Sequence, residues 1–173
     1  MLKKVDFLWL LASPLYLLIG TLRHEASHAL VSWLEGATIT EFVFWPTTHR
    51  GRLLWGYVRF SGSTSWLTTA APYFVDLLTF GLLFWLCTRF HFGRRWLWLN
   101  AVIIGLISPL VNSTYNYQNA FQGAGDIGRL LDILPPPAVH AYMIGTIALY
   151  VIGLWLVFKA PVCCVVESTE PDT

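Results

Sequence analysis

Long apolar stretches separated by short polar connections dominate the pattern along the chain. Four of these stretches approach the length of about 20 apolar residues that a membrane helix needs. They run from about Phe7 to Trp33, from about Trp66 to Thr88, from about Trp96 to Val111 and from about Ala138 to Phe158. The pattern therefore predicts an α-helical integral membrane protein with about four transmembrane helices.

Two of the connections have patterns of their own. Residues 37–60 alternate apolar and polar positions in two runs, which predicts a small membrane-associated β-hairpin. Residues 112–137 are too polar to span a membrane and too apolar for a solvated loop. Glycines at 123 and 125 interrupt them, and the run DIGRLLDIL that follows predicts a short helix ended by three prolines.

Composition agrees with a multi-pass integral membrane protein that contacts the lipid bilayer. The chain has 173 residues, of which 55% are hydrophobic and 12% charged, whereas soluble domains carry about 25% charged residues. The net charge is +1 and the basic residues are scattered, so no nucleic acid is expected as a partner. Residues 1–160 are expected to form a single domain, and residues 161–173 a flexible tail.

The first apolar stretch contains the motif His24-Glu25-Ala26-Ser27-His28, an H-E-x-x-H. On a helix the two histidines share one face, about 5–6 Å apart at Cβ, so both imidazoles can reach one Zn²⁺. Glu25 then lies beside the open coordination position, where it can take a proton from a zinc-bound water. Ionisable groups inside a membrane are costly and usually functional. The alternative is that the span ends near Thr21 and that the motif is an ordinary interfacial helix end.

A catalytic zinc usually has three protein ligands and one water, so a third ligand is expected. Asp126 is the first choice, because three spans would return residues 112–137 to the side of the membrane where the histidine pair lies. Asp132 is the next choice, and Asp126 could instead cap the short helix. His91 falls in the turn on the other side, and the apolar surroundings of His140 favour a packing or interfacial role. The full set of candidates is His49, His91, His140, Asp76, Asp126 and Asp132.

Further polar residues are expected near the site. Asp76 lies in the middle of the second apolar stretch, where it would support a ligating histidine or pair with Arg23. It could also be a buried, protonated side chain hydrogen-bonded between helices. Asn112 and Asn116 begin the polar connection and are candidates to line a cavity that admits water to the zinc.

Together these features resemble the site-2 protease family of intramembrane zinc metalloproteases. The resemblance covers about residues 10–135. It rests on the H-E-x-x-H helix, on the hairpin after it and on Asp126-Ile127-Gly128-Arg129, which is similar to the family's Asp-Gly-Gly-Arg motif. It implies that His24, His28 and Asp126 bind one zinc per chain and that Glu25 is the general base.

The resemblance also implies an activity. A zinc-dependent intramembrane endopeptidase would hydrolyse peptide bonds within or near the transmembrane segments of other membrane proteins. The hairpin could hold such a substrate extended as an added strand, or it could be an interfacial lid. Ile127 stands where the family usually has glycine, and Arg23 is an unusual charge before the motif, so the chain would be a compact, divergent member. Two other classes stay open: a non-catalytic membrane scaffold or regulator, and a membrane zinc hydrolase of a lipid or small amide.

Overall fold

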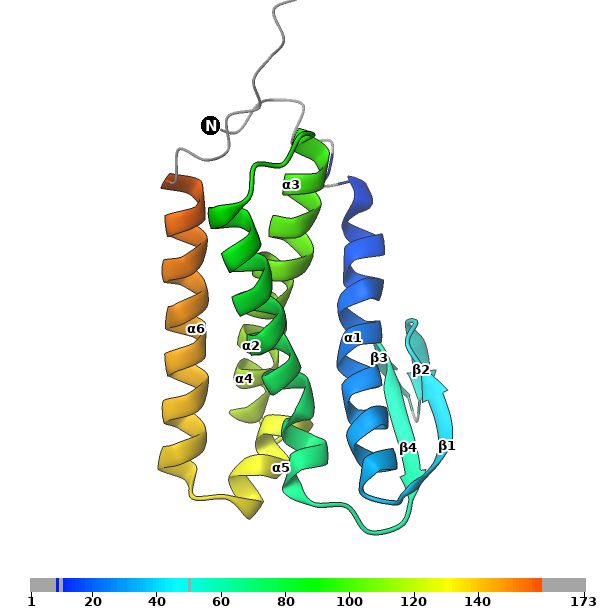
Figure 1. Ribbon diagram of the computed structural model, residues 1–173. Coiled ribbons are helices and arrows are strands. Elements are labelled where there is room, and N and C mark those ends of the chain that lie inside the picture. Colours follow the sequence, from blue (N-terminus) through cyan, green and yellow to red (C-terminus); the bar gives the residue numbers. More distant parts are fainter. Residues whose placement is uncertain (1–8, 10, 50, 160–173) are drawn as a thin grey trace, which may run out of the picture.

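The computed structural model describes residues 9, 11–49 and 51–159, so the expected tail at 161–173 lies outside the described residues. Long helices stand side by side, and a small hairpin lies beside α1 (Figure 1). The helices are α1 (Ser13–Leu34), α2 (Trp66–Arg89), α3 (Arg95–Val102), the π-helical turn η2 (Ile103–Ile107), α4 (Ser108–Ala120), α5 (Gly125–Ile133) and α6 (Pro136–Lys159). The strands are β1 (Thr38–Val43), β2 (Thr47–His49), β3 (Arg52–Leu54) and β4 (Tyr57–Ser61).

Among the described residues, three helical segments are long and apolar enough to cross a membrane. They are α2, the continuous run Arg95–Ala120 made of α3, η2 and α4, and α6. α1 has 22 residues but is not among these three segments, and its second half carries the charged and polar residues of the H-E-x-x-H region. The helical architecture is confirmed, and three helical runs fit a membrane by length and composition; the fourth span stays a prediction.

The third span is longer than the sequence suggests. The expected end was Val111, with residues 112–137 forming a connection, but the helix continues to Ala120. Asn112 and Asn116 do not end it, because their polar groups bond within the protein: the Asn116 amide donates to the backbone carbonyl of Asn112 at 3.0 Å. The short helix expected after residue 125 is present as α5 and ends before the prolines.

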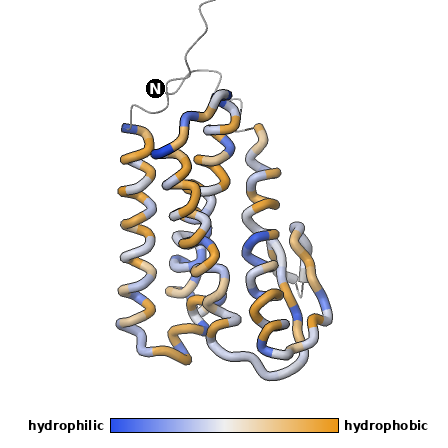
Figure 2. Tube along the Cα trace, in the orientation of Figure 1, coloured by the Kyte–Doolittle hydropathy of each residue, from blue (hydrophilic) through white to orange (hydrophobic). Residues whose placement is uncertain are grey.

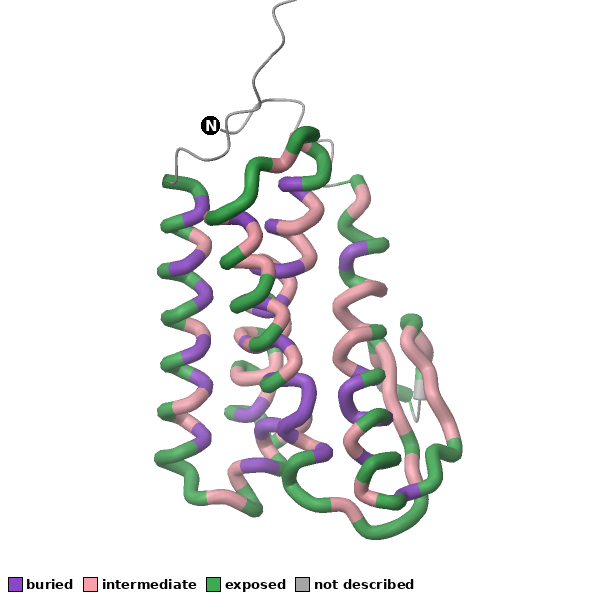
Figure 3. The backbone as a smooth tube through the Cα atoms, viewed as in Figure 1, coloured by how far each residue is buried: buried purple, intermediate pink, exposed green. Residues whose placement is uncertain are grey.

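The outward-facing side chains of the bundle are largely apolar. Figure 3 shows exposed positions along the outer face of α6, and Figure 2 shows that many positions of this helix are hydrophobic. Leu78, Ile144 and Trp155 are 72%, 57% and 54% exposed. A large apolar exterior around an apolar core is what lipid surroundings favour.

The hairpin expected at 37–60 is present as two short antiparallel ladders. β1 pairs with β4 from Thr38 opposite Ser61 to Val43 opposite Tyr57, with an irregularity between Ile39 and Glu41. Closer to the tip of the hairpin, β2 pairs with β3. The hairpin lies beside the half of α1 that contains the H-E-x-x-H motif (Figure 1).

Helix packing places two glycines at close approaches. A Cβ added at Gly105 would lie 2.3 Å from Cβ of Leu83, and one at Gly153 would lie 2.5 Å from the tip of the Phe80 ring. Phe80 belongs to a buried cluster that joins α2, α3, η2 and α6. The close contact of η2 with α2 therefore needs glycine at position 105.

We expect Gly105→Ala to destabilise the protein by about 1–3 kcal/mol, because Cβ of Leu83 cannot move away without a backbone shift. Gly81→Ala on α2 is the matched control, since an added Cβ there meets nothing within 4 Å, and alanine favours a helix. Thermal unfolding in detergent micelles compares the two. Equal melting temperatures for both variants would contradict the packing described.

Candidate metal centre

Three side chains from two distant segments converge on one point. Nε2 of His24 and Nε2 of His28 each lie 3.1 Å from the same Oδ2 of Asp126. One donor atom from each of the three residues lies within 4.8 Å of the others. Donor atoms about 2.0–2.1 Å from a tetrahedral zinc are themselves about 3.3 Å apart, so this spacing suits a single ion. The expected return of the 112–137 segment to the histidine pair is confirmed.

Asp126 lies in the first turn of α5, and it does not cap that helix. The N-cap residue is Ala124, and no side chain bonds to the free backbone amides there. Gly125 has φ of 77°, a left-handed conformation that glycine adopts without strain. Burial raises the pKa of the Asp126 carboxyl, but hydrogen bonds from both histidines outweigh it and hold that pKa well below its usual range. The carboxylate is therefore charged and available as a ligand.

Glu25 is buried, with 8% of its surface exposed. The bend between β3 and β4 packs directly on it: a Cβ added at Gly56 would lie 3.0 Å from Cγ of Glu25 and 2.6 Å from Cγ2 of Thr21. It would also lie 2.8 Å from the backbone oxygen of Val43. Only glycine fits at this position, and sequence reasoning missed it, although a glycine inside a strand pattern is a signal of close approach.

The backbone of α2 holds His28. Nδ1 of His28 lies 2.7 Å from the carbonyl oxygen of Thr68, and the Thr68 hydroxyl donates to Glu35 at 2.9 Å. Glu35 also accepts from the backbone amide of Ser65 at 2.8 Å and from the Ser65 hydroxyl. These bonds from Ser65 lower the pKa of the Glu35 carboxyl. The end of α1 is thereby tied to the start of α2, which places the Thr68 carbonyl beside His28.

Polar side chains surround His24. The amide nitrogen of Asn112 lies 3.2 Å from Nδ1 of His24 and donates to Asp76 at 2.7 Å. Arg23 donates to the other oxygen of Asp76 at 2.8 Å, which confirms the expected pairing of Asp76 with Arg23. Among the described side chains, Asp76 does not bond to a histidine directly and reaches His24 only through Asn112. The side-chain amide of Asn116 donates to the side-chain oxygen of Asn112 at 2.9 Å.

The other candidates do not join the three ligands in the described part of the chain. His140 bonds to the hydroxyl of Tyr117 at 2.9 Å, a packing role as expected. The described residues form no second group of metal-ligating side chains around Asp132 or His91, and the side chain of His49 lies outside the described residues.

Tyr73 is a neighbour of the centre that sequence reasoning missed. Its ring packs edge-on against His24, with ring centroids 6.0 Å apart. The side chain is 2% exposed, and its hydroxyl has no hydrogen-bond partner among the described residues.

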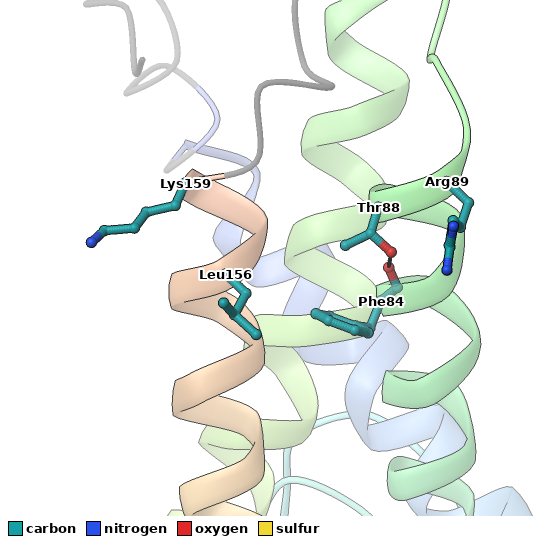
Figure 4. Close-up of a pocket in the computed structure, with 5 residues that line it drawn as sticks. All are labelled: Phe84, Thr88, Arg89, Leu156 and Lys159. Carbon is teal, nitrogen blue, oxygen red and sulfur yellow. Dashed lines mark hydrogen bonds between the residues drawn. The ribbon is translucent and has the colours of Figure 1, made fainter.

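An open depression lies between α2 and α6 at the opposite end of the bundle (Figure 4). Its lining contains no metal-ligating carboxylate, histidine or cysteine; it consists of Phe84, Thr88, Arg89, Leu156 and Lys159. The candidate metal centre is therefore separate from this depression. Comparisons with family models, with curated proteins and with solved structures found no match for this chain.

We expect the purified wild-type chain to hold about one zinc per molecule. His28→Ala and Asp126→Ala should each lose it, because two remaining ligands bind zinc weakly. Asp132→Ala is the matched control and should keep the metal, since Asp132 lies outside the converging group. Elemental analysis after dialysis measures the content; full zinc occupancy in Asp126→Ala would move the third ligand elsewhere.

Proposed function

We propose that this chain is a zinc-dependent intramembrane endopeptidase that hydrolyses peptide bonds within or near the transmembrane segments of other membrane proteins. The observation that carries the proposal is the convergence of His24, His28 and Asp126 next to a buried Glu25. Two of the helical runs long and apolar enough for a membrane contact this group, α2 through Thr68 and Arg95–Ala120 through Asn112. The resemblance to site-2 proteases leads to the same activity.

The donor set fits zinc. Two imidazole nitrogens and one carboxylate oxygen are a ligand set typical of catalytic zinc, which keeps a fourth position open. Bound there, zinc would acidify a water molecule and polarise the carbonyl of the scissile bond. His24, His28 and Asp126 would hold the ion.

Glu25 performs the proton transfers in the proposed reaction. It follows His24 directly in the motif, and its carboxylate accepts a proton from the attacking water. The same carboxyl group then donates that proton to the leaving amine, so that the products are a free carboxylate and a free amine. Burial of Glu25 under Gly56 keeps the carboxyl group out of bulk solvent and limits its side-chain freedom.

A transmembrane helix is a poor substrate until it unwinds, because its carbonyls are hydrogen-bonded within the helix. The hairpin offers a way to hold an unwound segment. β1 pairs with β4 and with no other strand in the described part of the chain, so a substrate strand can add to this small sheet. Gly56 brings the hairpin against Glu25, which favours delivery of the extended segment to the site.

We expect Glu25→Gln to reduce the rate of cleavage of a transmembrane reporter protein by about 10²–10⁴-fold, with the zinc content unchanged. Asp132→Asn is the matched control, because Asp132 lies on α5, outside the converging ligands and outside the hairpin proposed to hold the substrate. The assay uses zinc-loaded protein and reporter reconstituted together in lipid vesicles.

Two results would overturn the proposal. Cleavage that persists in Glu25→Gln would exclude Glu25 as the general base. A zinc-loaded wild type that leaves a panel of transmembrane reporters intact would also exclude the proposed activity. Hydrolysis of lipid amides by that protein would then indicate a membrane zinc hydrolase of small substrates. Absence of any hydrolysis would indicate a non-catalytic scaffold.

A further inference from the structure

A proline explains why a backbone carbonyl is available to His28. Pro72 lies inside α2 and has no N–H, so the carbonyl of Thr68, four residues earlier, has no α-helical donor. That oxygen lies 2.7 Å from Nδ1 of His28, and the contact is buried. With an ordinary residue at position 72, the same oxygen would be engaged within α2.

A second proline has the same effect on the neighbouring span. In η2 the backbone amide of Ser108 donates to Ile103, five residues earlier, and so does not serve Ile104. The donor in the same pattern for Ile104 would be residue 109, which is Pro109 and has no N–H. Nη1 of Arg23 donates to the freed Ile104 carbonyl at 3.0 Å, and Nη2 donates to the Ser108 hydroxyl at 3.1 Å.

The two contacts fix α1 from different directions. Arg23 and His28 are five positions apart, which places them about 140° apart around a helix with 3.6 residues per turn. One contacts η2 and the other contacts α2. Rotation of α1 about its axis would break at least one of these bonds, so together they set where the metal ligands face.

We propose that Pro72 is a positioning residue of the metal centre. Because Pro72 has no N–H, the Thr68 carbonyl is free to accept the proton on Nδ1 of His28, which leaves Nε2 for the metal. Pro109 anchors α1 in the same way, because it frees the Ile104 carbonyl to accept from Arg23. The proposal rests on the proposed metal centre.

A neutral imidazole carries one proton, and in the metal-free protein the Asp126 carboxylate, 3.1 Å from Nε2, competes for it with the Thr68 carbonyl at Nδ1. A metal that bound Asp126 would remove this competition, and the bond from Nδ1 to the Thr68 carbonyl would then leave Nε2 free to ligate. In the described part of the chain His24 has no such backbone acceptor; its Nδ1 lies 3.2 Å from the side-chain amide nitrogen of Asn112, which also donates to Asp76.

The competing explanation is structural. Proline in a membrane helix often only bends it, and any nearby donor or water satisfies the freed carbonyl. On that explanation, replacing Pro72 changes the shape or stability of α2 but leaves the preferred proton position on His28 as it was. The proton position is therefore the quantity to measure.

The test examines Pro72→Ala, which restores an N–H that can draw the Thr68 carbonyl back into α2. For the NMR measurement both this variant and the parent chain carry Asp126→Ala, so that no carboxylate competes for the proton at Nε2 of His28. Nitrogen NMR of ¹⁵N-histidine-labelled, metal-free protein in detergent, at a pH where the imidazoles are neutral, reports which ring nitrogen is protonated. His28→Ala assigns the signal. In the Asp126→Ala background we expect His28 to be protonated on Nδ1 when Pro72 is present and to shift toward Nε2 in Pro72→Ala. In the chain that keeps Asp126, Pro72→Ala should lower the zinc affinity about 10–100-fold.

Pro137→Ala is the matched control, because Pro137 lies in the first turn of α6, where a missing N–H frees no helical carbonyl. It should leave both the proton position and the zinc affinity unchanged. A folded Pro72→Ala protein with the proton position of the parent chain and the wild-type zinc affinity would overturn the proposal. Because the NMR readout needs no metal, it decides the role of Pro72 even if wild type proves unable to bind zinc.

A second variant covers the case in which Pro72→Ala does not fold. An α-hydroxy acid placed at position 72 by nonsense suppression has no N–H, as proline has none, but has no ring. We expect it to keep the proton position of the parent chain on His28. A folded protein of this kind with the proton on Nε2 would show that the ring of Pro72, and not the missing donor, matters, and would overturn the proposal.

Discussion

The contact of Asp126 with both histidines is the constraint on which the rest of the site depends. It joins α1 to the first turn of α5, residues about a hundred positions apart in the chain. To make it, α2 must return past α1 and the run Arg95–Ala120 must come back to the same end of the bundle, as Figure 1 shows. Without that return the two histidines of the H-E-x-x-H motif would have no carboxylate beside them, and the proposed metal site would lack its third ligand.

Placing this motif among apolar helices leaves several polar groups that need partners. Burying a charge without a partner is strongly unfavourable. Arg23 meets Asp76, the Ile104 carbonyl and the Ser108 hydroxyl, and Asp76 also accepts from Asn112. These bonds explain how the charged Arg23 side chain is accommodated among largely apolar helices. They also connect α1 with α2 and with the η2–α4 segment around the metal ligands.

Local chemistry could be predicted from the sequence, and so could the topology that completes it. The spacing of His24 and His28 depends only on helix periodicity, and the choice of Asp126 followed from counting spans. The end of the third span could not be predicted, because the polarity of Asn112 and Asn116 has the same pattern whether these side chains face solvent or the protein interior. The role of Gly56 could not be predicted, because it depends on the contact of the hairpin with α1.

The roles of Pro72 and of the Thr68 carbonyl were also beyond sequence reasoning. The sequence does not show which backbone carbonyl is free. That depends on which helix contains a proline and on which side chain of a neighbouring helix lies beside the freed carbonyl. Tyr73 is a similar case: its burial beside His24 arises from helix packing. The residue types at a metal centre can be predicted from motifs, whereas the groups that orient them come from the three-dimensional arrangement.

X-ray absorption at the zinc edge of the zinc-loaded wild-type protein tests the central claim most directly, because it reports the atoms bound to the metal. The account predicts a four-coordinate ion with two imidazole ligands, further light-atom ligands at about 2.0–2.2 Å and no sulfur. A shell that contains sulfur at about 2.3 Å, or one with a single imidazole, would contradict a centre built from His24, His28 and Asp126.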